Sequence, residues 1–182
     1  MRGRICDAAT MRLSRAGYHR MTIQDVVKKA AISTGALQHH FPTKEALVIA
    51  VAERLLSRSV RWFHRAKAEL GSGAFPEMIR RSWREQFRTD DYGALLEILV
   101  AARTDKSLRT SVAPALERWR DEIEGELKEM LPDEKDAAYL ETVLTISRCM
   151  MTGLLVHDGL LQDERRMDTV IDEWIRIVSR RD

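Results

Sequence analysis

The segment TIQDVVKKAAISTGALQHHFPTK, residues 22–44, holds the pattern that decides the fold. Its apolar residues first recur at the i, i+3, i+4, i+7 spacing of a short amphipathic helix, at Ile23, Val26, Val27 and Ala30. Thr22 is placed to cap that helix, and residues 31–33 then interrupt the period. Ser33 is in turn a good cap for a second short helix over residues 34–39.

The second expected helix combines one core residue with an outer face that carries no carboxylate. Leu37 is the core residue, and Phe41 follows just beyond the helix. The outer face has only small or hydrogen-bonding groups: Thr34, Gly35, Ala36, Gln38, His39 and His40. Two short helices joined by a tight turn, the second slim and acid-free, are typical of a helix-turn-helix that enters the major groove of DNA.

The sequence ISTGALQHHFPTKEAL (residues 32–47) resembles the signature of the TetR family of transcriptional regulators, and the resemblance extends back through AATMRLSRAGYHRMTI (residues 8–23). It covers about the first quarter of the chain. Two positions depart from the family pattern, because Gln38 stands where the family usually has Tyr and Ala31 where the turn usually has Gly. If residue 31 needs a left-handed backbone, alanine should cost about 1 kcal/mol there.

The candidate DNA contacts follow from helix geometry and from this resemblance. Gln38 can bond an adenine edge bidentately, and His39 is the next exposed residue. Thr22 and Lys44 lie at helix N-termini, where free N–H groups favour an anion. The resemblance implies phosphate contacts at matching positions, and a base contact from the position of Gln24. The full set is Thr22, Gln24, Ser33, Thr34, Gly35, Ala36, Gln38, His39, His40 and Lys44.

Charge is distributed unevenly along the 182 residues. Residues 1–45 hold eight Lys and Arg against three Asp and Glu, although the whole chain has 30 against 28. A basic segment joined to a mildly acidic one indicates that the N-terminal part meets the polyanion. Arg2 and Arg4 could touch a phosphate or a minor groove, or form a solvated terminus.

Other features exclude several classes of protein. Cys6 and Cys149 are too few for a disulfide framework or a zinc site, and both are interpreted as small core residues. We expect a cytoplasmic protein, because no signal peptide or transmembrane run is present, and no metal, cofactor or membrane partner. No P-loop, Gly-x-Ser-x-Gly or dinucleotide fingerprint appears, so we expect no enzyme, although a site built from scattered Ser, His and Asp stays an alternative.

All remaining segments have helical periodicity, and none alternates like a strand. We therefore predict an all-α chain of about nine helices. Residues 1–45 would form a DNA-binding head of three helices, and residues 46–182 a helical domain behind it. Helices are expected to begin at Thr43, Pro76 and Asp90, and Pro114 to start or kink another.

The resemblance implies that the helical domain senses a small molecule and forms the dimer. Aromatic, Met and polar residues inside its apolar stripes are the candidate effector ligands: Trp83, Gln86, Phe87, Arg103, Trp119, Met150 and His157. An ordinary core with a few hydrogen-bonded polar groups is the alternative. Residues 140–157 and 167–179 have stripes wide enough to meet a second copy, with Ser147 and Gly153 allowing close approach.

The resemblance therefore implies a homodimeric repressor that a small, largely apolar effector releases from a palindromic operator in double-stranded DNA. In this hypothesis, effector binding displaces the long helix that begins near Lys44 and so changes the spacing of the two heads. A helical DNA-associated or partner-binding protein without an effector is the alternative function.

Overall fold

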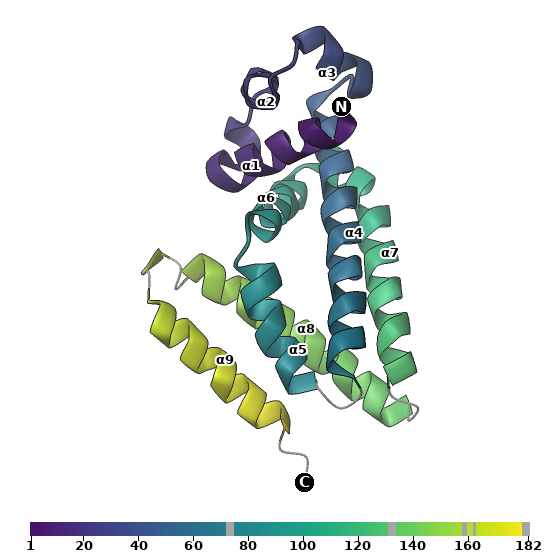
Figure 1. Ribbon diagram of the computed structural model, residues 1–182, viewed down its shortest axis with the longest axis vertical. Coiled ribbons are helices and arrows are strands. Elements are labelled where there is room, and N and C mark those ends of the chain that lie inside the picture. The colour runs from purple at the N-terminus through teal and green to yellow at the C-terminus, as the bar shows by residue number, and fades with distance from the viewer. Residues whose placement is uncertain (72–74, 131–133, 158–159, 162, 180–182) are drawn as a thin grey trace. The chain divides into compact units, whose positions relative to one another are not determined.

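The computed structural model describes residues 1–71, 75–130, 134–157, 160–161 and 163–179 (Figure 1). This part contains nine α-helices, one π-helix and no strand, which confirms the all-α prediction. The elements are α1 (Arg2–Arg20), α2 (Ile23–Ala30), α3 (Thr34–His40), α4 (Lys44–Leu70), α5 (Phe75–Ser82), η1 (Trp83–Phe87), α6 (Asp90–Thr104), α7 (Lys106–Met130), α8 (Glu134–His157) and α9 (Glu164–Ser179).

Local capping explains why the head helices begin and end where they do. The Thr22 hydroxyl accepts from the N–H of Asp25, whose carboxylate accepts in return from the Thr22 N–H. Ser33 caps α3 by accepting from the N–H of Ala36 at 3.1 Å. At Gly17, φ is 79°, so α1 is kinked there. These contacts confirm the expected caps of both short helices.

The turn between α2 and α3 has a left-handed residue. Ala31 has φ 51° and ψ 55°, and it is the one non-glycine residue with positive φ among those described. This confirms that the position needs the conformation that glycine adopts without cost. Alanine therefore holds the turn with some backbone strain.

The chain forms two compact units, and helices α4 and α7 contribute residues to both. The first unit combines Met1–Ser59 with Thr89–Trp119, and the second combines Val60–Arg88 with Arg120–Asp182. The predicted functional division at residues 1–45 and 46–182 is a different one and stays a prediction.

The first unit has a continuous apolar core from α1–α4, α6 and α7. Its fully buried large side chains include Ile5, Leu13, Leu37, Phe41, Leu47, Ile98 and Leu108. Helix α6 packs on α1, and side chains of its first turn are bonded to α1 and to α4. The Ser14 hydroxyl donates to Asp90 at 2.7 Å, and Arg58 pairs with Asp91 at 3.1 Å. These bonds fix the first turn of α6 to α1 and α4.

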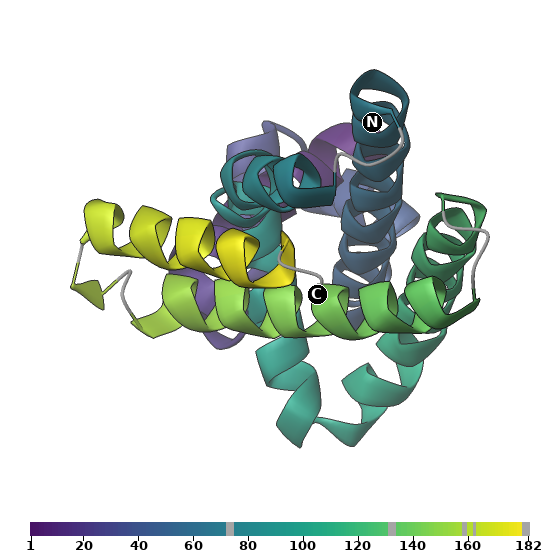
Figure 2. The ribbon, with the colours of Figure 1, turned by 90° about the horizontal axis from the view of Figure 1, so that it is seen from below.

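The second unit is built around α5, η1, α8 and α9, and α8 and α9 lie side by side (Figure 2). Trp83 is buried at its centre and donates to Asp168 at 3.0 Å. Ser147 is also buried and accepts from the indole of Trp174 at 2.7 Å. The expectation that Ser147 allows close approach of a second copy is therefore wrong, because this side chain faces its own unit.

The structure tests three further expectations. The helix predicted from Pro76 through Phe87 changes to a π-helix at Trp83. Pro114 lies inside the single helix α7, so of the two alternatives it does not start a helix. Cys6 is buried as expected, but Cys149 is exposed, so it is not a core residue.

None of the helices among the described residues is both long enough and apolar enough to cross a membrane.

Candidate nucleic-acid interface

The outer face of α3 is open and free of acidic side chains. Gln38 and His39 are exposed, whereas Leu37 is fully buried and fixes the helix to the head. Ser33, Thr34 and Gly35 are exposed at its start, and a Cβ at Gly35 would meet nothing within 4 Å. The first turn of the helix is therefore slim, as entry into a major groove requires.

The two adjacent histidines differ in exposure. His39 is exposed and His40 is half-buried, with their rings 5.4 Å apart in an edge-on arrangement. His40 also lies beside Phe41, at 6.5 Å between ring centroids. His39 is thus the more accessible of the two, and His40 lies between the outer face and the core.

Asp25 accepts the side-chain and main-chain donors of Thr22 at the start of α2. The Thr22 hydroxyl donates to Asp25 at 2.8 Å, and the Thr22 N–H donates to the same oxygen at 3.2 Å. Arg12 reaches this carboxylate at 3.4 Å. The Thr22 bonds, with the nearby Arg12, hold the pKa of Asp25 below its usual range. The N–H groups of Ile23 and Gln24 are the first-turn donors that the cap bonds of Thr22 and Asp25 do not use.

Lys44 is engaged inside the head. Its ammonium donates to the main-chain carbonyl of Tyr18 at 2.6 Å and lies 4.5 Å from the centre of the Tyr18 ring. Burial lowers the pKa of Lys44. The Lys44 side chain therefore links α4 to the end of α1, and the main-chain N–H groups of the first turn of α4 are the donors left for a phosphate. Thr43 caps that turn by accepting from Ala46 at 3.0 Å.

Two arginines of α1 fold against the helix-turn-helix. Arg4 donates to the carbonyl of Ala30 at 3.2 Å, beside the turn between α2 and α3. The Arg2 guanidinium lies 4.6 Å from the centre of the Phe41 ring. Both side chains of this terminus are therefore anchored on the head.

The structure assembles the DNA-contact candidates on the head, all within α2, α3, their caps and the first turn of α4. Sequence reasoning missed the link from Arg12 through Asp25 to Thr22 and the link from Lys44 to Tyr18. The first had a signal, because a carboxylate three residues after a threonine cap is the pattern of a capping box. The second joins residues 26 apart and has no such local signal.

The effector candidates, unlike the DNA-contact candidates, are divided between the two units. Trp83, Phe87 and Met150 share one apolar cluster of the second unit, and Gln86 is half-buried in η1. Arg103 and Trp119 belong to the first unit, where Arg103 is exposed and Trp119 packs against the core. His157 is exposed at the end of α8. Among the described residues, no group of three His, Cys, Asp or Glu side chains is arranged to hold a metal ion.

Comparisons with known proteins agree with this geometry. Residues 5–51 match the family model of bacterial regulatory proteins, tetR family. The HTH-type transcriptional regulator CymR of Pseudomonas putida is 30% identical over 188 residues, covering 98% of this chain and 89% of that protein. The HTH-type transcriptional regulator UidR of Escherichia coli K12 is 43% identical over 61 residues, or 31% of each chain.

Solved structures share the fold at low identity. The transcriptional regulator FadR from Bacillus subtilis, in complex with stearoyl-CoA, has a TM-score of 0.72 at 14% identity, with 97% of both chains covered. A regulator structure from Saccharomonospora viridis, in complex with choline, has a TM-score of 0.66 at 21% identity, with 96% of this chain and 95% of that chain covered.

Proposed function

Because this chain belongs to the tetR family of bacterial regulatory proteins and is a DNA-binding transcriptional regulator, we propose that it is a homodimeric repressor released from a palindromic operator by a small, largely apolar effector. The observation that carries the proposal is the acid-free outer face of α3, with Gln38 and His39 exposed. Sequence would be read in the major groove by Gln38, and the first turns of α2 and α4 would grip phosphate through main-chain N–H groups.

A second copy of the chain is supported by an exposed stripe on α8. Its members recur at alternating spacings of three and four residues, and each is exposed: Tyr139, Thr142, Ile146, Cys149, Gly153 and Val156. Ile146 is 45% exposed and Val156 53% exposed, and exposed apolar side chains that line up on one helix face are typical of an interaction surface. Gly153 has nothing within 4 Å of a Cβ position, so another helix could approach there.

Such a stripe has the period of helices that pack nearly parallel or antiparallel to one another. A two-fold dimer through α8 and α9 would set two α3 helices about 34–36 Å apart, one turn of DNA, on a palindrome.

An apolar effector is supported by the second unit and by relatives. Trp83, Phe87 and Met150 provide aromatic and thioether surface in one cluster. Two proteins of the same fold have been crystallised with stearoyl-CoA and with choline, so this architecture accommodates organic ligands. A ligand shifts the two-state equilibrium only by its differential affinity, typically about 1–3 kcal/mol of coupling.

Effector binding would change the position of the head through α4 and the first turn of α6. Asp90 and Asp91 bond Ser14 of α1 and Arg58 of α4, respectively. Displacement of α4 would strain these bonds, change the spacing of the two heads and lower operator affinity. A compound that binds the second unit and leaves operator affinity unchanged at fixed salt would refute this route for that compound.

Selection of duplexes from a random pool tests the proposal. The expected result is enrichment of one palindrome that the protein prefers over random duplex at physiological salt. A steep salt dependence without any preference would instead favour the alternative, a helical DNA-associated protein without operator or effector.

A further inference from the structure

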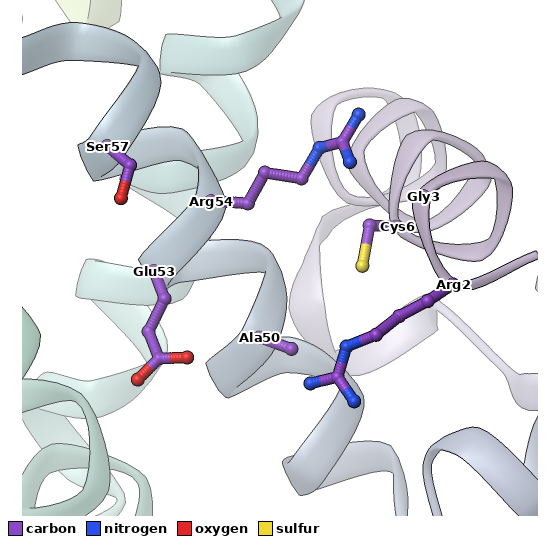
Figure 3. Close-up of a pocket in the computed structure, with 7 residues that line it drawn as sticks. All are labelled: Arg2, Gly3, Cys6, Ala50, Glu53, Arg54 and Ser57. Carbon is purple, nitrogen blue, oxygen red and sulfur yellow. The ribbon is translucent and has the colours of Figure 1, made fainter. Parts of the chain in front are cut away.

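The first unit has a hollow between the start of α1 and the middle of α4 that the DNA-reading surface does not use (Figure 3). Its volume is about 360 Å³, and it is lined by Arg2, Gly3, Cys6, Ala50, Glu53, Arg54 and Ser57. A space of this size admits a phosphate group together with part of the molecule that carries it. The lining is polar and dominated by two guanidinium groups.

Arg2 is held in place but keeps its donors. Its guanidinium lies 4.6 Å from the centre of the Phe41 ring, and the described residues offer it no carboxylate partner. A guanidinium over an aromatic ring has lost conformational freedom, whereas its in-plane N–H groups stay available for a bidentate oxyanion.

Arg54 brings a second guanidinium to the same hollow. It donates to Asp7 at 2.8 Å, in an ion pair whose two side chains are 39% and 55% exposed. Gly3 makes room for it, because a Cβ there would lie 3.1 Å from an Arg54 nitrogen. An exposed pair of this kind contributes little free energy, so Arg54 can share its donors with a second anion.

Asp7 and Glu53 offset part of this charge, and with Arg118 the three guanidinium groups exceed the two carboxylates by one. Glu53 is the one carboxylate that lines the hollow, and Arg118 of α7 reaches it at 3.5 Å. Figure 3 shows Arg2 and Arg54 on either side of Cys6. Burial raises the pKa of the Cys6 thiol, against the opposing effect of Arg54 and Arg2, so the thiol is neutral near pH 7. Ser57 adds a hydroxyl donor at the α4 side.

We propose that this hollow is a binding site for a phosphate-type oxyanion, with Arg2 and Arg54 as its charged ligands and Ser57 as a neutral donor. The oxyanion has two possible sources, a backbone phosphate of the bound operator or a free anion. Only the first source rests on the proposed function. Both use the same chemistry. They differ in the measurement that responds to the loss of Arg2, which is the salt dependence of operator binding for a DNA phosphate and the stabilisation by added anion for a free anion.

The test compares Arg2→Gln and Arg54→Gln with Arg15→Gln, which removes an exposed positive charge from α1 outside the hollow. In the first arm, operator affinity of the full-length protein is measured against salt concentration. If the site holds a DNA phosphate, Arg2→Gln reduces the slope of log K against log salt by about 0.9 for each protomer, and Arg15→Gln changes it much less.

In the second arm, sulfate and inorganic phosphate replace chloride at constant ionic strength without DNA. If the site holds a free anion, Tm of the parent and of Arg15→Gln has a saturable rise, whereas Tm of Arg2→Gln and Arg54→Gln shows only the non-saturable rise that excluded anions give any protein. A positive result in either arm supports the site and identifies its source. If Arg2→Gln and Arg54→Gln match Arg15→Gln in both arms, the site is refuted. A parent protein without operator preference refutes the proposed function, and the second arm then decides on the oxyanion site alone.

Discussion

The ammonium group of Lys44 donates a hydrogen bond of 2.6 Å to the main-chain carbonyl oxygen of Tyr18. This bond joins the first residue of α4 to α1 just beyond the kink at Gly17. A lysine that the sequence places beside the DNA phosphates therefore has a structural partner inside the head. Substitution of Lys44 should therefore lower the stability of the head more than it weakens the electrostatic attraction to DNA.

Lys44→Met is expected to lower the free energy of unfolding by about 1 kcal/mol, because it removes the hydrogen bond that the charged ammonium donates to the Tyr18 carbonyl and keeps the aliphatic stem. Urea unfolding of the parent and the variant measures this difference. Unchanged stability together with a smaller salt dependence of DNA binding would mean that the ammonium reaches a phosphate instead.

Ala31→Gly is expected to stabilise the protein by about 0.5–1 kcal/mol. At φ 51°, glycine avoids the clash of a Cβ with the backbone, and this gain exceeds the added entropy of the unfolded chain. Ala68→Gly, at an exposed helical position of α4, is the matched control and should destabilise by about 1 kcal/mol. Chemical denaturation in which both variants lose stability would contradict the role of the left-handed turn.

Asp25→Ala is expected to destabilise the head at neutral pH, and this effect should fade in acid. The pKa of Asp25 is lowered in the folded protein by its bonds from Thr22 and by Arg12. Its stabilising contribution is therefore complete above the unfolded pKa of about 3.9 and is lost as pH falls through the lower folded value.

Thermal unfolding of parent and Asp25→Ala between pH 3 and pH 7 measures this dependence. The gap in Tm should be constant from about pH 5 upward and should narrow below about pH 4. A difference in Tm that widens as pH falls would show that folding raises the pKa of Asp25 instead of lowering it.

Ile146→Asp is expected to give a folded monomer. The substitution places a charge in the exposed stripe of α8, where burial against a second copy would cost several kcal/mol. Thr110→Asp, exposed on α7 and outside both α8 and α9, is the control and should stay dimeric. Light scattering after size exclusion gives both masses, and an unchanged mass for Ile146→Asp would exclude the stripe as the interface.

Local signals predicted much of the head. The caps at Thr22 and Ser33 and the strained turn at Ala31 each depend on a few neighbouring residues. Such features are visible in sequence because their energetics are local. The start of α6 at Asp90, after the cap Thr89, belongs to the same class.

Features set by tertiary packing were not predictable in the same way. Trp83 begins the π-helix, and its buried indole donates to Asp168, which is 85 residues away in sequence. Ser147 is buried because Trp174 supplies its partner, and Arg103 is exposed although its helix has an apolar stripe through that position. The effector candidates shared a periodic pattern, but periodicity alone does not show which neighbouring element faces a stripe.

The central claim is that the exposed face of α3 reads sequence, and Gln38 tests it most directly. Affinities of the parent and Gln38→Ala should be measured at one salt concentration for the selected operator, single-base-pair variants and random duplex. We predict that the variant loses about 1–3 kcal/mol of discrimination at the base pair that Gln38 contacts and retains its affinity for random duplex. If Gln38→Ala binds every duplex as the parent does, α3 does not read the operator through this residue.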